Sequence, residues 1–125
     1  RVTPFLDGVL YQARETVVDD SPHPLYFIRS RDEGVKTVEA FRDQNVRDIV
    51  VRGGTCHVLV SNPVADGYAS EILETDDLKS WRRIGRFESE AMAYSLETAD
   101  GRYFVGMGTL RDLTIQESGA IYILE

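Results

Sequence analysis

The chain has 125 residues, of which 42% are hydrophobic and 28% charged, a composition typical of one soluble globular domain spanning residues 1–125. Its formal net charge of −7 argues against a nucleic-acid partner, because binding to phosphates requires a basic surface. The sequence shows no signal-peptide pattern and no apolar run near the ~18 residues that a membrane span needs. Cys56 is the single cysteine, so an internal disulfide is excluded and a hydrophobic core must hold the fold.

Hairpins of one design recur along the chain. In residues 3–11, 49–60 and 94–105 an apolar run leads into a turn with glycine, and a second apolar run follows. Asp-Gly and Gly-Gly between such runs predict β-hairpins, because glycine tolerates the positive φ that these turns demand. Gly8, Gly54 and Gly101 are separated by 46 and 47 residues, which indicates an internal repeat of about 46 residues.

A second family of hairpins lies between the first, in residues 25–41 and 69–87, and Phe41 and Phe87 are again 46 positions apart. Four short strands per unit of roughly 40–50 residues are typical of a β-propeller blade. The repeat therefore predicts an all-β chain of two and a half to three blades, at about residues 1–41, 42–87 and 88–125. A β-sandwich of about eleven short strands is the alternative. Residues 38–46 are the nearest candidate for a helix, and their helical periodicity is weak.

Two motifs resemble the five-bladed glycoside hydrolases of families 43 and 32, the arabinanase/xylosidase and invertase/fructanase groups. Blades of these enzymes carry Arg-Asp-Pro, a glycine hairpin and then Ser-x-Asp-Leu-x-x-Trp. Residues 47–49 here read Arg-Asp-Ile, and residues 75–81 read Thr-Asp-Asp-Leu-Lys-Ser-Trp. Glu90-Ala91-Met92 is similar to the Glu-Cys-Pro that opens a later inner strand, with the Glu kept and the Pro lost.

The resemblance implies that Glu90 is a general acid and Asp48 a carboxylate that stabilises the transition state. Inner strands of neighbouring blades start at one mouth of the channel, so both side chains would point into the same funnel. A pair of nearby carboxylates raises the pKa of at least one member, and glycosidases use such pairs. The enzymes' nucleophile or base is an Asp before a Pro, and Thr3-Pro4 stands there. The catalytic set is thus incomplete, and surface carboxylates are the alternative interpretation of Asp48 and Glu90.

Aromatic side chains are the candidates for stacking on a sugar ring. We single out Trp81, Tyr94 and Tyr103, although the place of Trp81 in a repeated hairpin also fits packing between blades. The repeat aligns His57 with aromatic residues, which favours a structural histidine. It also aligns Cys56 with Leu10 and Tyr103, which favours a core position. The spacing of histidine, cysteine and acidic residues predicts no metal site, and no motif indicates a nucleotide or other cofactor.

These features leave two hypotheses: a glycoside hydrolase-like protein, or a module that binds a carbohydrate or a protein without catalysis. Half a ring would expose an inner hairpin at one end and an unpaired strand at the other, and such edges pair readily with another chain. The apolar residues 120–124 need a partner of this kind. We therefore expect a homodimer in which two three-blade halves close a six-bladed ring.

Overall fold

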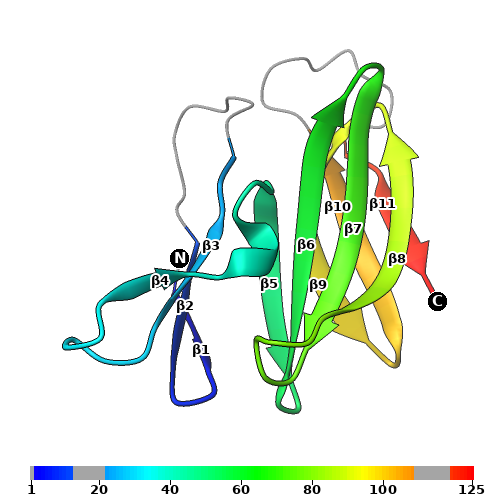
Figure 1. Ribbon diagram of the computed structural model, residues 1–125. Coiled ribbons are helices and arrows are strands. Elements are labelled where there is room, and N and C mark those ends of the chain that lie inside the picture. Colours follow the sequence, from blue (N-terminus) through cyan, green and yellow to red (C-terminus); the bar gives the residue numbers. More distant parts are fainter. Residues whose placement is uncertain (1, 13–21, 109–118) are drawn as a thin grey trace.

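The computed structural model describes residues 2–12, 22–108 and 119–125, and these residues form three antiparallel β-sheets (Figure 1). Sheet 1 contains β1 (Val2–Phe5), β2 (Gly8–Gln12), β3 (Leu25–Ile28) and β4 (Val35–Thr37) in that order. Sheet 2 contains β5 (Val46–Arg52), β6 (Thr55–Val64), β7 (Gly67–Thr75) and β8 (Arg82–Ser89). Sheet 3 contains β9 (Met92–Ala99), β10 (Arg102–Gly108) and β11 (Ile121–Leu124).

The expected all-β character is confirmed. The weak helix candidate at residues 38–46 is reduced to one 3₁₀ turn, η1 (Glu39–Phe41), which places the buried Phe41 between sheets 1 and 2. Within the described ranges no helix is long and apolar enough to cross a membrane.

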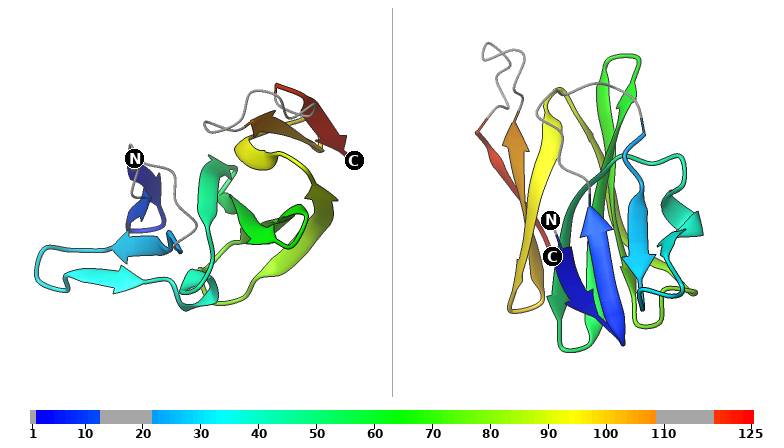
Figure 2. Two further views of the ribbon diagram at one scale, coloured as in Figure 1. Left: turned by 90° about the horizontal axis from the view of Figure 1, so that it is seen from above. Right: turned by 90° about the vertical axis from the view of Figure 1, so that its left-hand side faces the viewer.

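The first strands of the three sheets lie next to one another. β5 contacts both β1 and β9, although no ladder of hydrogen bonds joins these strands. Seen from above, the sheets fan outward from the row formed by β1, β5 and β9 (Figure 2, left). We call these three the innermost strands, and the arrangement brings residues from three distant parts of the sequence to one place.

Sheet 2 is covered on both faces, and each face belongs to a separate hydrophobic core. Alternate residues of a strand point to opposite faces, so one strand serves both cores. On β6, Val58 packs toward sheet 1 and Leu59 packs toward sheet 3, and neither side chain is exposed. The core with sheet 1 consists of Phe5, Leu10, Leu25, Phe27, Val38, Phe41, Val46, Ile49, Cys56, Val58 and Val60. The core with sheet 3 consists of Val50, Leu59, Ile72, Ala91, Ala93, Leu96, Val105 and Met107.

The first hairpin of each sheet closes with a two-residue turn, and this corrects the alignment made from the glycines. Pairs Phe5–Gly8, Arg52–Thr55 and Ala99–Arg102 flank the turns. The turns are residues 6–7, 53–54 and 100–101, so both spacings are 47 residues (53 − 6 and 100 − 53).

The corrected spacing moves Gly8 from the turn to the start of β2. Cys56 then corresponds to Val9 and Tyr103, and His57 to Leu10 and Phe104. The earlier alignment of Cys56 with Leu10 was wrong by one residue, and a one-residue slip exchanges the two faces of a strand. Gly8 was mistaken for a turn residue because a glycine was expected to supply the positive φ of the turn, whereas Leu6 adopts it (52°).

Gly8 is required for a different reason, the close approach of β3. A Cβ atom at this position would lie 2.5 Å from the Ile28 carbonyl oxygen and 2.7 Å from the Phe27 ring. We expect Gly8→Ala to lower the free energy of unfolding by about 1–3 kcal/mol, the usual effect of overpacking. Gly108→Ala is the matched control, because a Cβ there meets no atom of the described residues within 4 Å. Urea unfolding of both variants tests this, and equal midpoints would contradict the steric explanation.

Candidate functional site

A cavity of about 550 Å³ lies along the three innermost strands. β1 lines it with Thr3 and Pro4, and β9 lines it with Leu96 and Glu97. β5 contributes the continuous run Asp48, Ile49, Val50, Val51 and Arg52. We call this space the central cavity. Its wall combines apolar side chains with one hydroxyl group and three charged groups, a mixture that suits a small polar ligand.

Asp48 is the buried carboxylate of the central cavity, with an exposed fraction of 7%. The Ile49 N–H donates to its Oδ1 at 2.9 Å, and the Leu96 N–H donates to its Oδ2 at 2.8 Å. A register shift between Val46 and Asp48 interrupts the pairing of β5 with β6 at this point. The second of these bonds joins sheet 2 to sheet 3, so Asp48 holds two innermost strands together.

Arg52 and Glu97 form an ion pair across the central cavity, between β5 and β9. Arg52 Nη2 donates to Glu97 Oε1 at 2.7 Å, and both side chains are about 60% exposed. An exposed pair of this kind contributes about 0–1 kcal/mol to stability. Its two charged groups are therefore more important as possible ligand contacts than as a source of stability. The sequence analysis missed both residues. The sequence feature that could have revealed them is that each is a charged residue on the first strand of a repeat.

The structure brings only part of the predicted catalytic set to the central cavity. Thr3 and Asp48 both line it. Glu90 is not among the lining residues and is exposed in the bend between β8 and β9. Asp48 contacts β9 at Leu96, and Glu90 precedes Leu96 by six residues. An extended chain of that length spans up to about 20 Å at ~3.3 Å per residue, which separates Glu90 from Asp48 along the strand. The second carboxylate of the cavity is Glu97 instead.

The three aromatic candidates lie in three different environments. Trp81 packs edge-on against Phe41, with ring centroids 4.6 Å apart, and joins the core between sheets 1 and 2. Tyr103 packs against His57 between sheets 2 and 3 at 5.4 Å. Tyr94 lies on β9 and is half exposed. None of the three lines the central cavity, so the structure does not assemble them into one aromatic platform.

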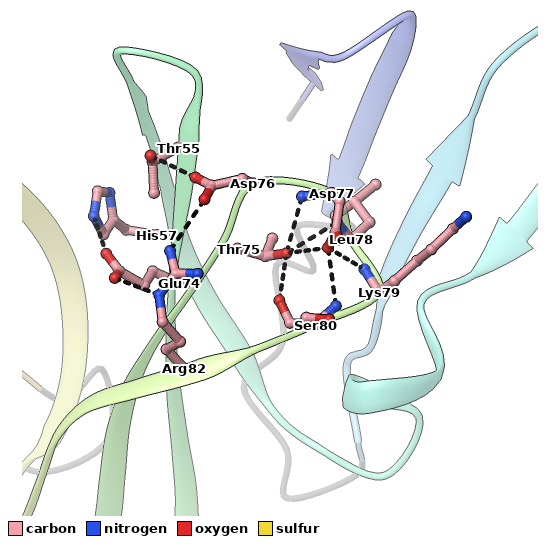
Figure 3. Close-up of polar contacts among 10 residues, drawn as sticks. All are labelled: Thr55, His57, Glu74, Thr75, Asp76, Asp77, Leu78, Lys79, Ser80 and Arg82. Carbon is pink, nitrogen blue, oxygen red and sulfur yellow. Dashed lines mark hydrogen bonds and ion pairs between the residues drawn. The ribbon is translucent and has the colours of Figure 1, made fainter.

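A chain of polar contacts surrounds His57 at the ends of β6, β7 and β8 (Figure 3). His57 Nε2 lies 3.1 Å from Glu74 Oε2, and Arg82 Nε donates to Glu74 Oε1 at 2.9 Å. Arg82 also contacts Asp76, which accepts a hydrogen bond from the Thr55 hydroxyl at 2.8 Å. The bond to Glu74 raises the pKa of Arg82, and the Thr55 hydroxyl lowers the pKa of Asp76. The network fixes these charges in place, with His57 nine-tenths buried.

The Thr75–Trp81 motif that resembles the hydrolases forms a tight connection between β7 and β8 (Figure 3). The fully buried Thr75 hydroxyl donates to the Ser80 carbonyl at 2.8 Å and accepts from the Leu78 N–H at 2.9 Å. The Asp77 carboxylate accepts from the N–H groups of Ser80 and Lys79, which lowers its pKa. The motif thus has a structural role: it shapes the turn that carries Trp81 to Phe41.

Comparison with known proteins found no match for this chain among protein-family models, curated proteins or solved structures. In the part of the chain that the structure describes, no three histidine, cysteine or acidic side chains gather as a metal site would require.

Removal of the Asp48 carboxylate tests its role between the strands. We expect Asp48→Ala to destabilise the fold by about 1–3 kcal/mol, because the buried Leu96 N–H loses its acceptor. Asp48→Asn keeps one acceptor oxygen and serves as the milder control. Hydrogen exchange at the Leu96 amide should accelerate more in the alanine variant than in the asparagine variant. Unchanged exchange in Asp48→Ala would contradict this role.

Cys56 lies in the core, as expected, and burial raises the pKa of its thiol to about 12. The thiolate is the reactive form, so a raised pKa keeps the native thiol unreactive near pH 8. We expect a thiol reagent to label the folded protein very slowly and the urea-unfolded protein within the ordinary reaction time. Mass spectrometry of both samples measures the difference, and rapid native labelling would show that the core opens readily.

Proposed function

We propose that the chain is part of a β-propeller and that it binds a carbohydrate in the central cavity without cleaving it. The propeller is supported by sheets that fan out from adjacent innermost strands (Figure 2, left) and by the regular spacing of the hairpin turns. In a β-sandwich, the alternative, two sheets would pack face to face around one core. Here sheet 2 takes part in two cores.

The observation that carries the binding proposal is the composition of the central cavity. Its volume of about 550 Å³ lies within the range of small-ligand sites. Arg52 and Glu97 offer donors and acceptors at the open side, and Thr3 adds a hydroxyl. Sugar hydroxyls pair with such groups, while Ile49 and Val51 offer apolar surface to the C–H faces of the ring.

The contacts of Asp48 favour binding over hydrolysis. Both of its oxygens accept backbone N–H groups, and the bond from Leu96 links β5 to β9. Thr3 cannot act as the carboxylate nucleophile or base of a glycosidase, and Glu90 lies outside the lining of the cavity. A retaining or inverting mechanism needs two carboxyl groups on either side of the scissile bond. Hydrolysis is the second candidate because Asp48, which the resemblance implies to be a catalytic carboxylate, lines the cavity.

Binding is tested with a panel of methyl glycosides and short oligosaccharides. A ligand of the folded state raises the melting temperature as the unfolding free energy increases by RT ln(1 + [L]/Kd). We expect Arg52→Ala and Glu97→Gln to weaken binding about 10-fold or more, the value of a charged hydrogen bond. Arg42→Ala is the matched control, because Arg42 pairs with Glu39 on the surface outside the cavity. Equal loss in the control, or no stabilising glycan, would contradict the proposal.

Turnover separates the two candidates. We expect no release of the chromophore from aryl glycosides by the unmodified chain. Measurable hydrolysis that disappears in Glu90→Gln, with the fold intact by circular dichroism, would instead establish the hydrolase. Stabilisation by a protein ligand and by no glycan would assign the chain to the protein-binding class.

A further inference from the structure

The two end sheets each present an apolar face that no described residue covers. We call the face of a sheet that looks toward the next sheet in the sequence its front, and the opposite face its back. Residues opposite one another in the ladders share a face, so the registers define both sets. The back of sheet 1 carries Val2, Pro4, Val9, Tyr11, Tyr26, Ile28 and Val35. The front of sheet 3 carries Phe104, Gly106, Ile121 and Ile123 on β10 and β11, while Arg102 at the start of β10 and Ser95 and Glu97 on β9 make the remainder of this face polar.

The exposure of these side chains is large for apolar residues in strands. On the back of sheet 1, Val2 is 59% and Val35 62% exposed. On the front of sheet 3, Ile121 is 67% and Ile123 57% exposed. Contiguous apolar surface on a regular sheet marks an interaction site.

Residues at the equivalent positions of the repeat form the contacts between sheets 1 and 2 and between sheets 2 and 3. Front positions Leu10 and His57 correspond to Phe104 by the spacing of the turns, and both face the next sheet. Back positions Cys56 and Tyr103 correspond to Val9, and both face the preceding sheet. Each interface in the structure therefore joins a front to the following back. One front and one back, of matching design, are left over.

We propose that a second copy of this chain covers them, with the back of its sheet 1 on the front of sheet 3 and the reverse contact at the other end. Two identical front-to-back contacts related by a two-fold axis close the assembly and leave neither face open. The inference rests on the faces of the sheets and not on the proposed ligand.

The number of sheets favours a second copy as the occupant. Propellers contain about four to eight blades, and two copies of the three described sheets supply six. The innermost strands would then surround one axis, and the central cavity of each copy would open toward that of its partner. No other segment of the described chain is available to cover either face.

The geometry of the contact follows from the interface between sheets 2 and 3. There His57 on β6 packs against Tyr103 on β10, with ring centroids 5.4 Å apart. Burial raises the pKa of Tyr103, and the nearby carboxylate of Glu74 on β7 raises it further. The positions equivalent to His57 and Glu74 in sheet 3 are Phe104 and Ile123. In the dimer, Phe104 and Ile123 thus lie against the partner's Val9.

Light scattering at several concentrations measures the assembly. We expect twice the 14.1 kDa mass of the chain for the unmodified protein. Ile123→Lys places a charge on the front of sheet 3, and Val9→Glu places one on the back of sheet 1. Each variant disrupts both contacts of the symmetric dimer, so each should have the monomer mass. Val64→Lys is the matched control, because Val64 is an exposed apolar residue on neither end face, and it should remain dimeric.

Mixing the two monomeric variants tests the front-to-back arrangement directly. The mixed dimer has one unmodified contact and one in which the introduced lysine faces the introduced glutamate, so the double mass should return. Restoration also shows that both variants are folded. A monomeric unmodified chain would overturn the proposal and assign the faces to other partners. Dimers of Val9→Glu alone would overturn it in favour of a contact between two copies of sheet 3.

Discussion

Sheet 2 has two apolar faces, and the requirement to cover both determines the arrangement of the molecule. A strand directs alternate residues to opposite faces, so β6 supplies Val58 to one core and Leu59 to the other. Sheets 1 and 3 satisfy this requirement from either side. The same requirement then applies to them, because they repeat the design of sheet 2.

The innermost strands raise a second requirement, which concerns backbone groups. β5 and β9 lie side by side without a ladder of hydrogen bonds, so their facing N–H groups need other acceptors. Asp48 supplies one acceptor to Leu96. Arg52 and Glu97 add a link at the solvent side of the same gap. The central cavity thus exists because edges of sheets meet there, and its polar character follows from how those edges are satisfied.

The sequence predicted the class of the fold because the repeat is strong and the turns are short. Hairpins and their approximate spacing follow from local turn chemistry, which a single sequence reveals. The face of each residue was less accessible: Gly8 was read as the turn, while Leu6 takes the positive φ. That error shifted the first-repeat counterparts of Cys56 and His57 by one residue each. Only the pairing of distant strands resolves such a slip, since local propensity is the same on both faces.

The site was predicted less well than the fold, for physical reasons that differ from residue to residue. Asp48 was singled out because residues 47–49 resemble the Arg-Asp-Pro motif, and its burial requires the compensation that two backbone N–H groups supply. Arg52 and Glu97 acquire their relation only when β5 and β9 come together. The Thr75–Trp81 motif was taken as evidence of an enzyme, but its hydrogen bonds serve the turn itself. A motif shared with an enzyme can thus record a common way of building a connection.

The polar pair His57–Glu74 explains why the interfaces between sheets are not interchangeable. The corresponding front positions are Leu10 and Phe27 in sheet 1, and Phe104 and Ile123 in sheet 3. At the back of sheet 3, Tyr103 packs against His57 through its ring and carries a polar hydroxyl. Val9 has neither a ring nor a polar side-chain atom, so sheet 1 placed against the front of sheet 2 would lose the ring contact that Tyr103 makes with His57. The pair thus favours sheet 3 over sheet 1 as the neighbour of the front of sheet 2.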